Sequence, residues 1–290
     1  MSAELGPVSH AFPLVPALAV ICAGVLHAIW NALAKAAPDR YAGFALIGIA
    51  QAGAGLLMVC LVGTPARASW PWIAVSIGVH VVYTALLARS YELGDFNQVY
   101  PLARGTGPLI VAFVAATTLG EHLTGPQLAG VAAVCGGLGA LAFAGGVSRR
   151  QSGAISAALL TGVSIAGYTL IDGVGVRHAG TAAAYSGWLF FGMGPLVIAW
   201  VYLARGTAVW PGIVAQWRLG IPGGLISVLG YGIVVWAQTR GALAAVAALR
   251  ETGVITGAII GAVFFHEKMG LPRFAAAGMV VVGVALINVH

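Results

Sequence analysis

The sequence predicts an all-α integral membrane protein of about ten transmembrane helices, arranged as two five-helix inverted repeats. Three observations predict this fold class. Hydrophobic residues fill 60% of the 290 positions and charged residues only 8%, whereas a soluble domain carries roughly 25% charged residues. The apolar residues gather in long runs, and one motif occurs twice, once before the middle of the chain and once near its C-terminus.

The apolar runs are long enough to cross a membrane, because a hydrocarbon core about 30 Å thick requires about 20 apolar residues per helix. Short polar or Pro/Gly-containing breaks separate them. Since no lysine or arginine precedes the first run, we expect a retained helix and not a cleaved signal peptide. The expected spans lie near residues 13–35, 41–63, 70–91, 97–118, 124–144, 152–173, 181–203, 217–238, 242–264 and 271–289.

The repeated motif occupies residues 97–121 and 243–267. When the copies are aligned, Arg104 meets Arg250 and Glu121 meets Glu267, at one constant separation (250 − 104 = 146). Each copy contains an arginine, a Thr-Gly pair, an apolar run and a closing glutamate. Such self-similarity indicates an internal repeat.

The longest central polar break, residues 148–152, divides the chain into a first repeat at 1–147 and a second at 148–290. Five spans per half is an odd number, so the second copy enters the membrane from the opposite side. This inverted arrangement is one that many secondary transporters use to build two equivalent gates around a central site.

The chain resembles the drug/metabolite transporter superfamily, specifically its EamA-type ten-helix exporters. The resemblance rests on the two five-helix halves, the Trp30-Asn31 pair, the stretch VYPLARGTGPL at residues 99–109, and the glutamates that close the fourth and ninth spans. It covers nearly the whole chain. It implies a bacterial inner-membrane exporter of amino acids and related metabolites, with a central cavity and cytoplasmic termini. Basic residues counted by loop place the termini outside instead; we follow the resemblance.

Ionisable side chains within the spans are the first candidates for a site, since each costs about 2.5–3.5 kcal/mol to insert. Arg104 and Arg250 lie at equivalent depths in their spans, and Glu251 follows Arg250. They either hold a substrate carboxylate or form a structural tie. We expect their environments to differ, with one arginine paired with Glu251 and dry and the other reached by water.

Polar and aromatic residues on shared helical faces complete the candidate site. Tyr100 lies one turn before Arg104, beside Pro101, which favours a kinked, cavity-lining segment. Trp30 and Tyr168 align approximately between the halves, although aromatic residues at such spacing most often only pack. His80 shares a face with Tyr83, as Tyr168 does with Asp172, and His80 either binds substrate or relays protons. The predicted substrate-binding residues are Trp30, His80, Tyr83, Tyr100, Arg104, Tyr168, Arg250 and Glu251.

The predicted function is secondary transport of a small polar metabolite, with an amino acid as the first choice. No GxxxxGK[ST] loop occurs, so proton coupling or substrate exchange is expected in place of ATP. The alternative is an integral membrane enzyme acting on a lipid or small amphipathic substrate, but neither an acidic cluster nor an HExxH or GxSxG motif supports it. We expect no cofactor, metal or nucleic acid partner. Glycines at 253, 257 and 261 favour packing within a monomer over a dimer interface.

Overall fold

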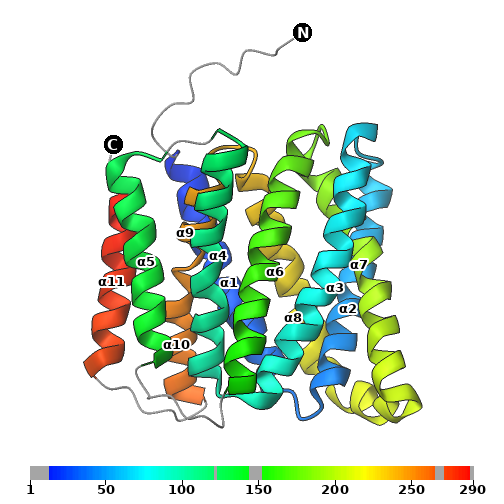
Figure 1. Cartoon of the computed structure of the whole chain (residues 1–290). Coiled ribbons are helices and arrows are strands. Elements are labelled where there is room, and N and C mark those ends of the chain that lie inside the picture. The colour runs from blue at the N-terminus through cyan, green and yellow to red at the C-terminus, as the bar shows by residue number, and fades with distance from the viewer. Residues whose placement is uncertain (1–12, 121–122, 144–151, 265–270, 288–290) are drawn as a thin grey trace.

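The chain forms a bundle of closely packed helices that run up and down in alternation (Figure 1). The computed structural model describes residues 13–120, 123–143, 152–264 and 271–287. The boundary expected between residues 147 and 148 lies outside these ranges, and so do Glu121 and Glu267.

Each half contributes a similar order of elements. The first half consists of α1 (Leu14–Ala36), α2 (Arg40–Val62), the short 3-10 turn η1 (Arg67–Ser69), α3 (Trp70–Leu93), α4 (Phe96–Thr118) and α5 (Gly125–Phe143). The second consists of α6 (Ser152–Arg177), α7 (Ala182–Arg205), the 3-10 turn η3 (Gly206–Val209), α8 (Trp210–Ala237), α9 (Leu243–Arg250), α10 (Gly253–Phe264) and α11 (Leu271–Ile287).

Local sequence signals set the ends of α2 and α7 in the same way. The side chains of Asp39 and Thr181 each accept a hydrogen bond from the backbone N–H three residues on, at 3.1 and 3.2 Å. Such caps satisfy amides that have no partner in the first turn of a helix. Both helices then end at a glycine with positive φ, Gly63 at 84° and Gly206 at 59°, where a side chain would be strained.

Seven stretches of the described chain are long and apolar enough to cross a membrane, and one of them, Ala182–Ala237, contains both α7 and α8. The all-helical chain thus has the character of an integral membrane protein, while the number of ten spans stays a prediction. The eighth span was expected from residue 217, but α8 begins at Trp210. The polar residues Gln216 and Arg218 interrupt the apolar run, so the sequence did not indicate the first two turns of α8. Pro211, next to its first residue, is nevertheless typical of a first helical turn.

The two halves interleave. α2 packs against α7 and α8, α1 packs against α8, and α3 packs against α6. At one end of the bundle α5 packs against α11, and α4 lies against both α5 and α6 (Figure 1). The inner faces of both halves therefore enclose one common interior.

The ninth span is divided at the motif arginine. α9 ends at Arg250, and α10 begins at Gly253 after a tight turn in which the amides of Glu251 and Thr252 donate to the carbonyls three residues back, at 3.1 and 3.2 Å. The matching stretch of α4 continues as a helix through Pro101. The two copies of the motif thus differ in backbone conformation where the charges lie.

Glycines allow α10 to approach its neighbours closely. A Cβ on Gly253 would collide with the backbone of Gly24 on α1, and a Cβ on Gly257 would lie 2.8 Å from the ring of Tyr100 on α4. Small residues let helices touch in lipid, where packing drives association. Both glycines therefore serve contacts within the chain.

Candidate functional site

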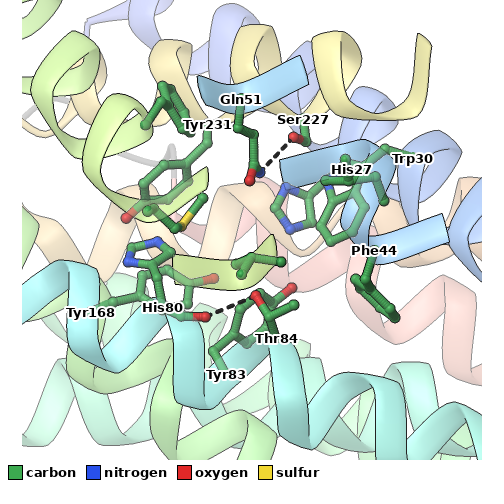
Figure 2. A pocket seen from close by; sticks show the side chains of 14 residues that line it. His27, Trp30, Phe44, Gln51, His80, Tyr83, Thr84, Tyr168, Ser227 and Tyr231 are labelled. Carbon is green, nitrogen blue, oxygen red and sulfur yellow. Dashed lines mark hydrogen bonds between the residues drawn. The ribbon is translucent and has the colours of Figure 1, made fainter. Parts of the chain in front are cut away.

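A pocket lies where the halves meet, lined by residues of α1, α2 and α3 from the first half and of α6, α7 and α8 from the second (Figure 2). Its cavity volume, counted as the space open to the centres of water-sized spheres, is about 40 Å³. Trp30, His80, Tyr83 and Tyr168, all members of the predicted set, line it. The remaining wall is mainly apolar and aromatic, with Phe44, Ile47, Phe190, Met193, Val197 and Tyr231 among its residues.

His80 is held by contacts on several sides. Its Nδ1 lies 3.0 Å from the carbonyl oxygen of Ser76, one turn earlier on α3. Its ring stacks on that of Tyr168, with centroids 4.1 Å apart and planes 24° apart, and meets the ring of Tyr231 edge-on at 5.2 Å. These contacts fix the imidazole at the pocket wall (Figure 2).

Behind His80 lies a buried carboxylate, Asp172 of α6. Its Oδ1 accepts a hydrogen bond of 2.8 Å from the hydroxyl of Tyr185, and its Oδ2 accepts one from Tyr231. The same Oδ2 lies 4.0 Å from Nε2 of His80. The sequence placed Asp172 on one face with Tyr168 but left it out of the predicted set. A carboxylate inside an apolar run was the signal for it.

Two arginines and one glutamate form a second group, close to the pocket. Nε of Arg104 lies 2.7 Å from Oε2 of Glu251, while Nε of Arg250 lies 3.6 Å from Oε1. The carboxylate therefore lies between two guanidinium groups. Two positive charges against one negative leave this cluster a net charge of +1.

The expectation about water at the arginines is wrong. The side chains of Arg104 and Arg250 are 2% and 1% exposed, so both are dry. Their environments differ in pairing instead: Nε of Arg104 forms a short hydrogen-bonded ion pair, whereas Arg250 forms none. Among the described residues, Nη1 and Nη2 of Arg104 and Nε and Nη1 of Arg250 have no hydrogen-bond partner. Both residues are buried inside the interleaved bundle, where α4 packs against α5, α6 and α9, and α9 packs against α1.

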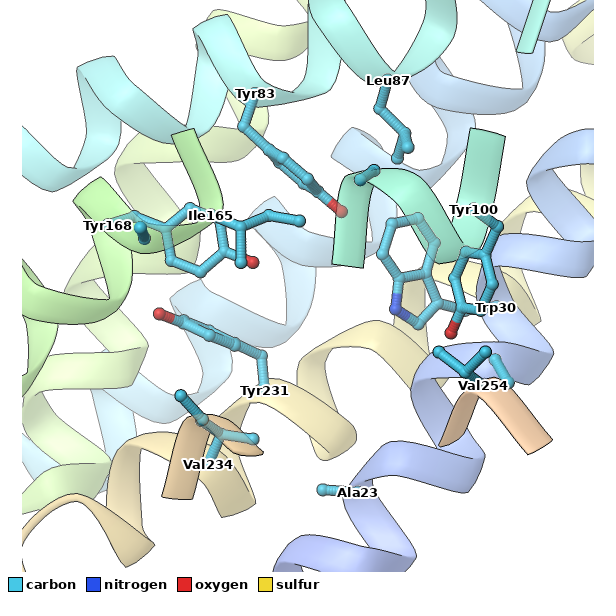
Figure 3. Close-up of a cluster of buried hydrophobic side chains, with 14 of the residues drawn as sticks. Ala23, Trp30, Tyr83, Leu87, Tyr100, Ile165, Tyr168, Tyr231, Val234 and Val254 are labelled. Atoms are coloured by element: carbon cyan, nitrogen blue, oxygen red, sulfur yellow. The ribbon is translucent and has the colours of Figure 1, made fainter. Parts of the chain in front are cut away.

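Aromatic rings connect the charged group to the pocket. The guanidinium carbon of Arg250 lies 6.0 Å from the ring centre of Tyr168, which lines the pocket, and that of Arg104 lies 5.9 Å from the ring of Tyr100. In Figure 3, Tyr83, Tyr168 and Tyr231 lie at one end of the buried cluster and Trp30 and Tyr100 at the other. Tyr100 itself does not line the pocket; it stacks on Phe96 at 4.8 Å.

The predicted set thus forms two neighbouring groups. The pocket group is Trp30, His80, Tyr83 and Tyr168, and the charged group is Tyr100, Arg104, Arg250 and Glu251. Sequence reasoning missed Gln51, whose amide donates 3.0 Å to the hydroxyl of Ser227 across the pocket from α2 to α8. Gln51 and Ser227 are both polar residues within apolar runs, which is the sequence signal that could have identified them.

Within the ranges that the structure describes, no three His, Cys, Asp or Glu side chains lie close enough together to hold a metal ion.

Comparisons with known proteins agree with this geometry. The EamA-like transporter family matches residues 152–289, the second half of the chain. A solved structure titled "Crystal structure of protein" shares the fold with a TM-score of 0.73, over 96% of this chain and 98% of that one, at 18% sequence identity. No curated protein sequence matches.

The family match lies on the half of the chain that carries Tyr168, Asp172, Arg250 and Glu251. It confirms the resemblance to the drug/metabolite transporter superfamily. Residues 152–289 match the EamA-like transporter family, and the chain is a membrane protein of the transporter type.

Proposed function

We propose that this chain is a secondary transporter that exports a small zwitterionic metabolite, an amino acid, across the bacterial inner membrane by alternating access. One observation carries the proposal: the pocket takes its walls from three helices of each half and borders a buried cluster with an unbalanced positive charge. A site shared by two halves can open to either side when the halves move relative to each other.

Three features support an inverted repeat of residues 1–147 and 148–290. α1 begins at the upper side of the bundle and α6 at the lower side (Figure 1). The packing of α3 on α6 has its counterpart in the packing of α8 on α1, as expected when a two-fold axis exchanges the halves. The caps and terminal glycines of α2 and α7 are repeated, and a Trp-Pro pair opens both α3 and α8.

The chemistry of the site favours a carboxylate together with an ammonium group. Nε and Nη1 of Arg250 have no hydrogen-bond partner among the described residues, and a carboxylate would accept a charge-assisted hydrogen bond from either of them. The rings of Trp30, Tyr83, Tyr168 and Tyr231 surround the pocket, and aromatic faces attract cations. A free amino acid carries both groups a short distance apart.

Arg104 is proposed to act as the alternate partner. Glu251 neutralises Arg104 in this structure, which leaves Arg250 for the substrate. In the opposite conformation, the repeat would exchange the roles of the two arginines. The chain is proposed to work as a monomer with its termini in the cytoplasm, driven by protons or by substrate exchange.

Counterflow in proteoliposomes tests this function. Purified protein is reconstituted into vesicles preloaded with one amino acid or amine from a panel, and uptake of the same labelled compound is measured. We expect transient accumulation of at least one amino acid, and none of amines that lack a carboxylate. Absence of counterflow for every compound, from monodisperse protein, would refute the proposal.

A further inference from the structure

The hydrogen-bond pattern of His80 fixes which ring nitrogen carries its proton. Nδ1 lies 3.0 Å from the carbonyl oxygen of Ser76 and 3.1 Å from the hydroxyl of the same residue. A carbonyl oxygen can only accept, so Nδ1 must donate, and Nε2 of the neutral ring is then an acceptor. The basic nitrogen of His80 therefore points away from its own helix.

This basic nitrogen faces a second acceptor. Nε2 lies 4.0 Å from Oδ2 of Asp172, and a carboxylate oxygen offers no hydrogen to it. Both oxygens of Asp172 already accept hydrogen bonds, from Tyr185 and Tyr231. Those two hydroxyls hold the carboxylate in place, with Oδ2 directed at the imidazole. A proton on Nε2 would convert this pair of facing acceptors into an ion pair.

We propose that His80 and Asp172 form the proton-binding site that drives this transporter, a step that rests on the proposed function. A proton from water in the pocket forms the Nε2–H bond, and the imidazolium is stabilised by the Asp172 carboxylate. Release reverses the step, with no change in oxidation state. His80 is the group that binds the proton, and Asp172 is a positioning residue that acts through it.

The surrounding charges are arranged so that the proton and the substrate affect each other. The Asp172 carboxylate, 4.0 Å from Nε2, attracts a positive charge on His80, and the Arg250 guanidinium, beside the Tyr168 ring that stacks on His80, repels it. The groups facing the pair are Tyr168 on α6, Tyr185 on α7, Tyr231 on α8, Arg250 on α9, His27 on α1 and Tyr83 on α3 itself. His80, Tyr168 and Tyr231 also line the pocket.

An ammonium group held by the rings of Tyr168 and Tyr231 would repel a protonated His80, so proton and substrate would exclude each other. Mutual exclusion at one site produces proton–substrate antiport.

Histidine NMR tests proton binding without any substrate. Protein labelled with ¹⁵N-histidine is titrated with acid, and the His80 signals are assigned by their loss in H80Q. We expect the neutral Nδ1–H form at high pH and protonation of Nε2 on acidification. In D172N proton binding should weaken at least about tenfold, which moves the midpoint to lower pH by about one unit. In E92Q, which removes a carboxylate at the outer end of α3, the midpoint should not move.

A second variant keeps the test decisive if D172N fails to fold. Y231F removes the hydroxyl that donates to Oδ2, which leaves that oxygen free for His80. The midpoint should then move in the opposite direction, to higher pH. A purely structural Asp172 would give neither shift. A His80 that stays unprotonated wherever the protein is folded, or that titrates identically in wild type and both variants, would overturn the proposal.

Transport measurements separate this inference from the proposed function. For the panel compound with the strongest counterflow, the rate is measured with and without a pH gradient. We expect the gradient to accelerate wild type and E92Q, and the ratio of the two rates to fall to about one in D172N and H80Q. Counterflow that ignores the gradient in wild type would refute proton coupling while the transporter function stands. Failure of counterflow in wild type would refute the function and leave the NMR result to decide proton binding.

Discussion

Glu251 is the residue on which the charged group depends. Its carboxylate is completely buried and lies between Arg104 at 2.7 Å and Arg250 at 3.6 Å. A buried charge is tolerated only when it is paired, so one acid here balances two bases incompletely. The pairing is also unequal, since only the contact with Arg104 is a hydrogen bond. We propose that this inequality gives the two arginines different roles in any one conformation.

The first residue prediction concerns the shape of the guanidinium. Arg104→Lys keeps the charge but loses the planar fork that contacts a carboxylate in a bidentate manner. Loss of a hydrogen bond to a charged group costs about 1.5–3 kcal/mol, or roughly ten- to hundredfold in rate. We expect counterflow to fall by that amount while expression and monodispersity are kept. The matched control is Arg205→Lys, an exposed arginine near Glu92, which should stay within about twofold. Normal counterflow by Arg104→Lys would mean that the arginine is structural.

The second prediction concerns the acid. Glu251→Gln leaves both arginines buried without a counter-charge, and breaking a buried pair costs about 3–5 kcal/mol. Thermal unfolding in detergent should therefore occur at a clearly lower temperature, and counterflow should be impaired. Glu92→Gln, which breaks partly exposed pairs with Arg89 and Arg205, should cost at most about 1 kcal/mol. Equal melting temperatures for the two variants would contradict the assigned pairing.

At this scale the sequence reveals which residues are unusual but not which of them meet. The depth of Arg104 and Arg250 follows from their place within apolar runs. The contact between Asp172 and Tyr231 does not, because helical spacing shows which side chains share a face and says nothing of which helix lies opposite. α6 and α8 are brought together only by the packing of the whole bundle.

At the scale of elements, the interrupted ninth span distinguishes the two copies of the motif. α9 and α10 meet at Glu251 and Thr252, and the beginning of α10 lies against α1 through Gly253 and Gly24. The sequence predicts a kink in the fourth span at Pro101, and α4 continues as a helix through it. The interruption after Arg250 was not predicted, because no proline marks it in the sequence. The sequence therefore located the segment but not its conformation.

The prediction for elements concerns this close approach. Gly253→Ala would force α10 away from α1, and such overpacking costs about 1–3 kcal/mol. Thermal stability should fall, and counterflow should fall with it because the charged group would shift. Gly139→Ala on α5, where an added Cβ meets nothing within 4 Å, should be neutral or stabilising by up to about 1 kcal/mol. A neutral Gly253→Ala would show that the two helices can separate without cost.

At the scale of the whole molecule, the interior is shared by both halves. The helices of one half pack mainly on those of the other, and the pocket takes its walls from three helices of each. The sequence predicts the division into two halves because the motif repeats. It does not predict how they interleave, since a repeat determines the relation between copies and leaves their interface unspecified.

The central claim, that this pocket opens to both sides of the membrane, is tested most directly by thiol labelling. Thr84, which lines the pocket, is changed to Cys in a protein whose Cys22, Cys60 and Cys135 are replaced by serine. A membrane-impermeant maleimide is applied to vesicles of defined orientation, first from one face and then from the other. We predict labelling from both faces, and slower labelling in the presence of the transported amino acid. Labelling from one face only, in protein that retains counterflow, would contradict alternating access at this pocket.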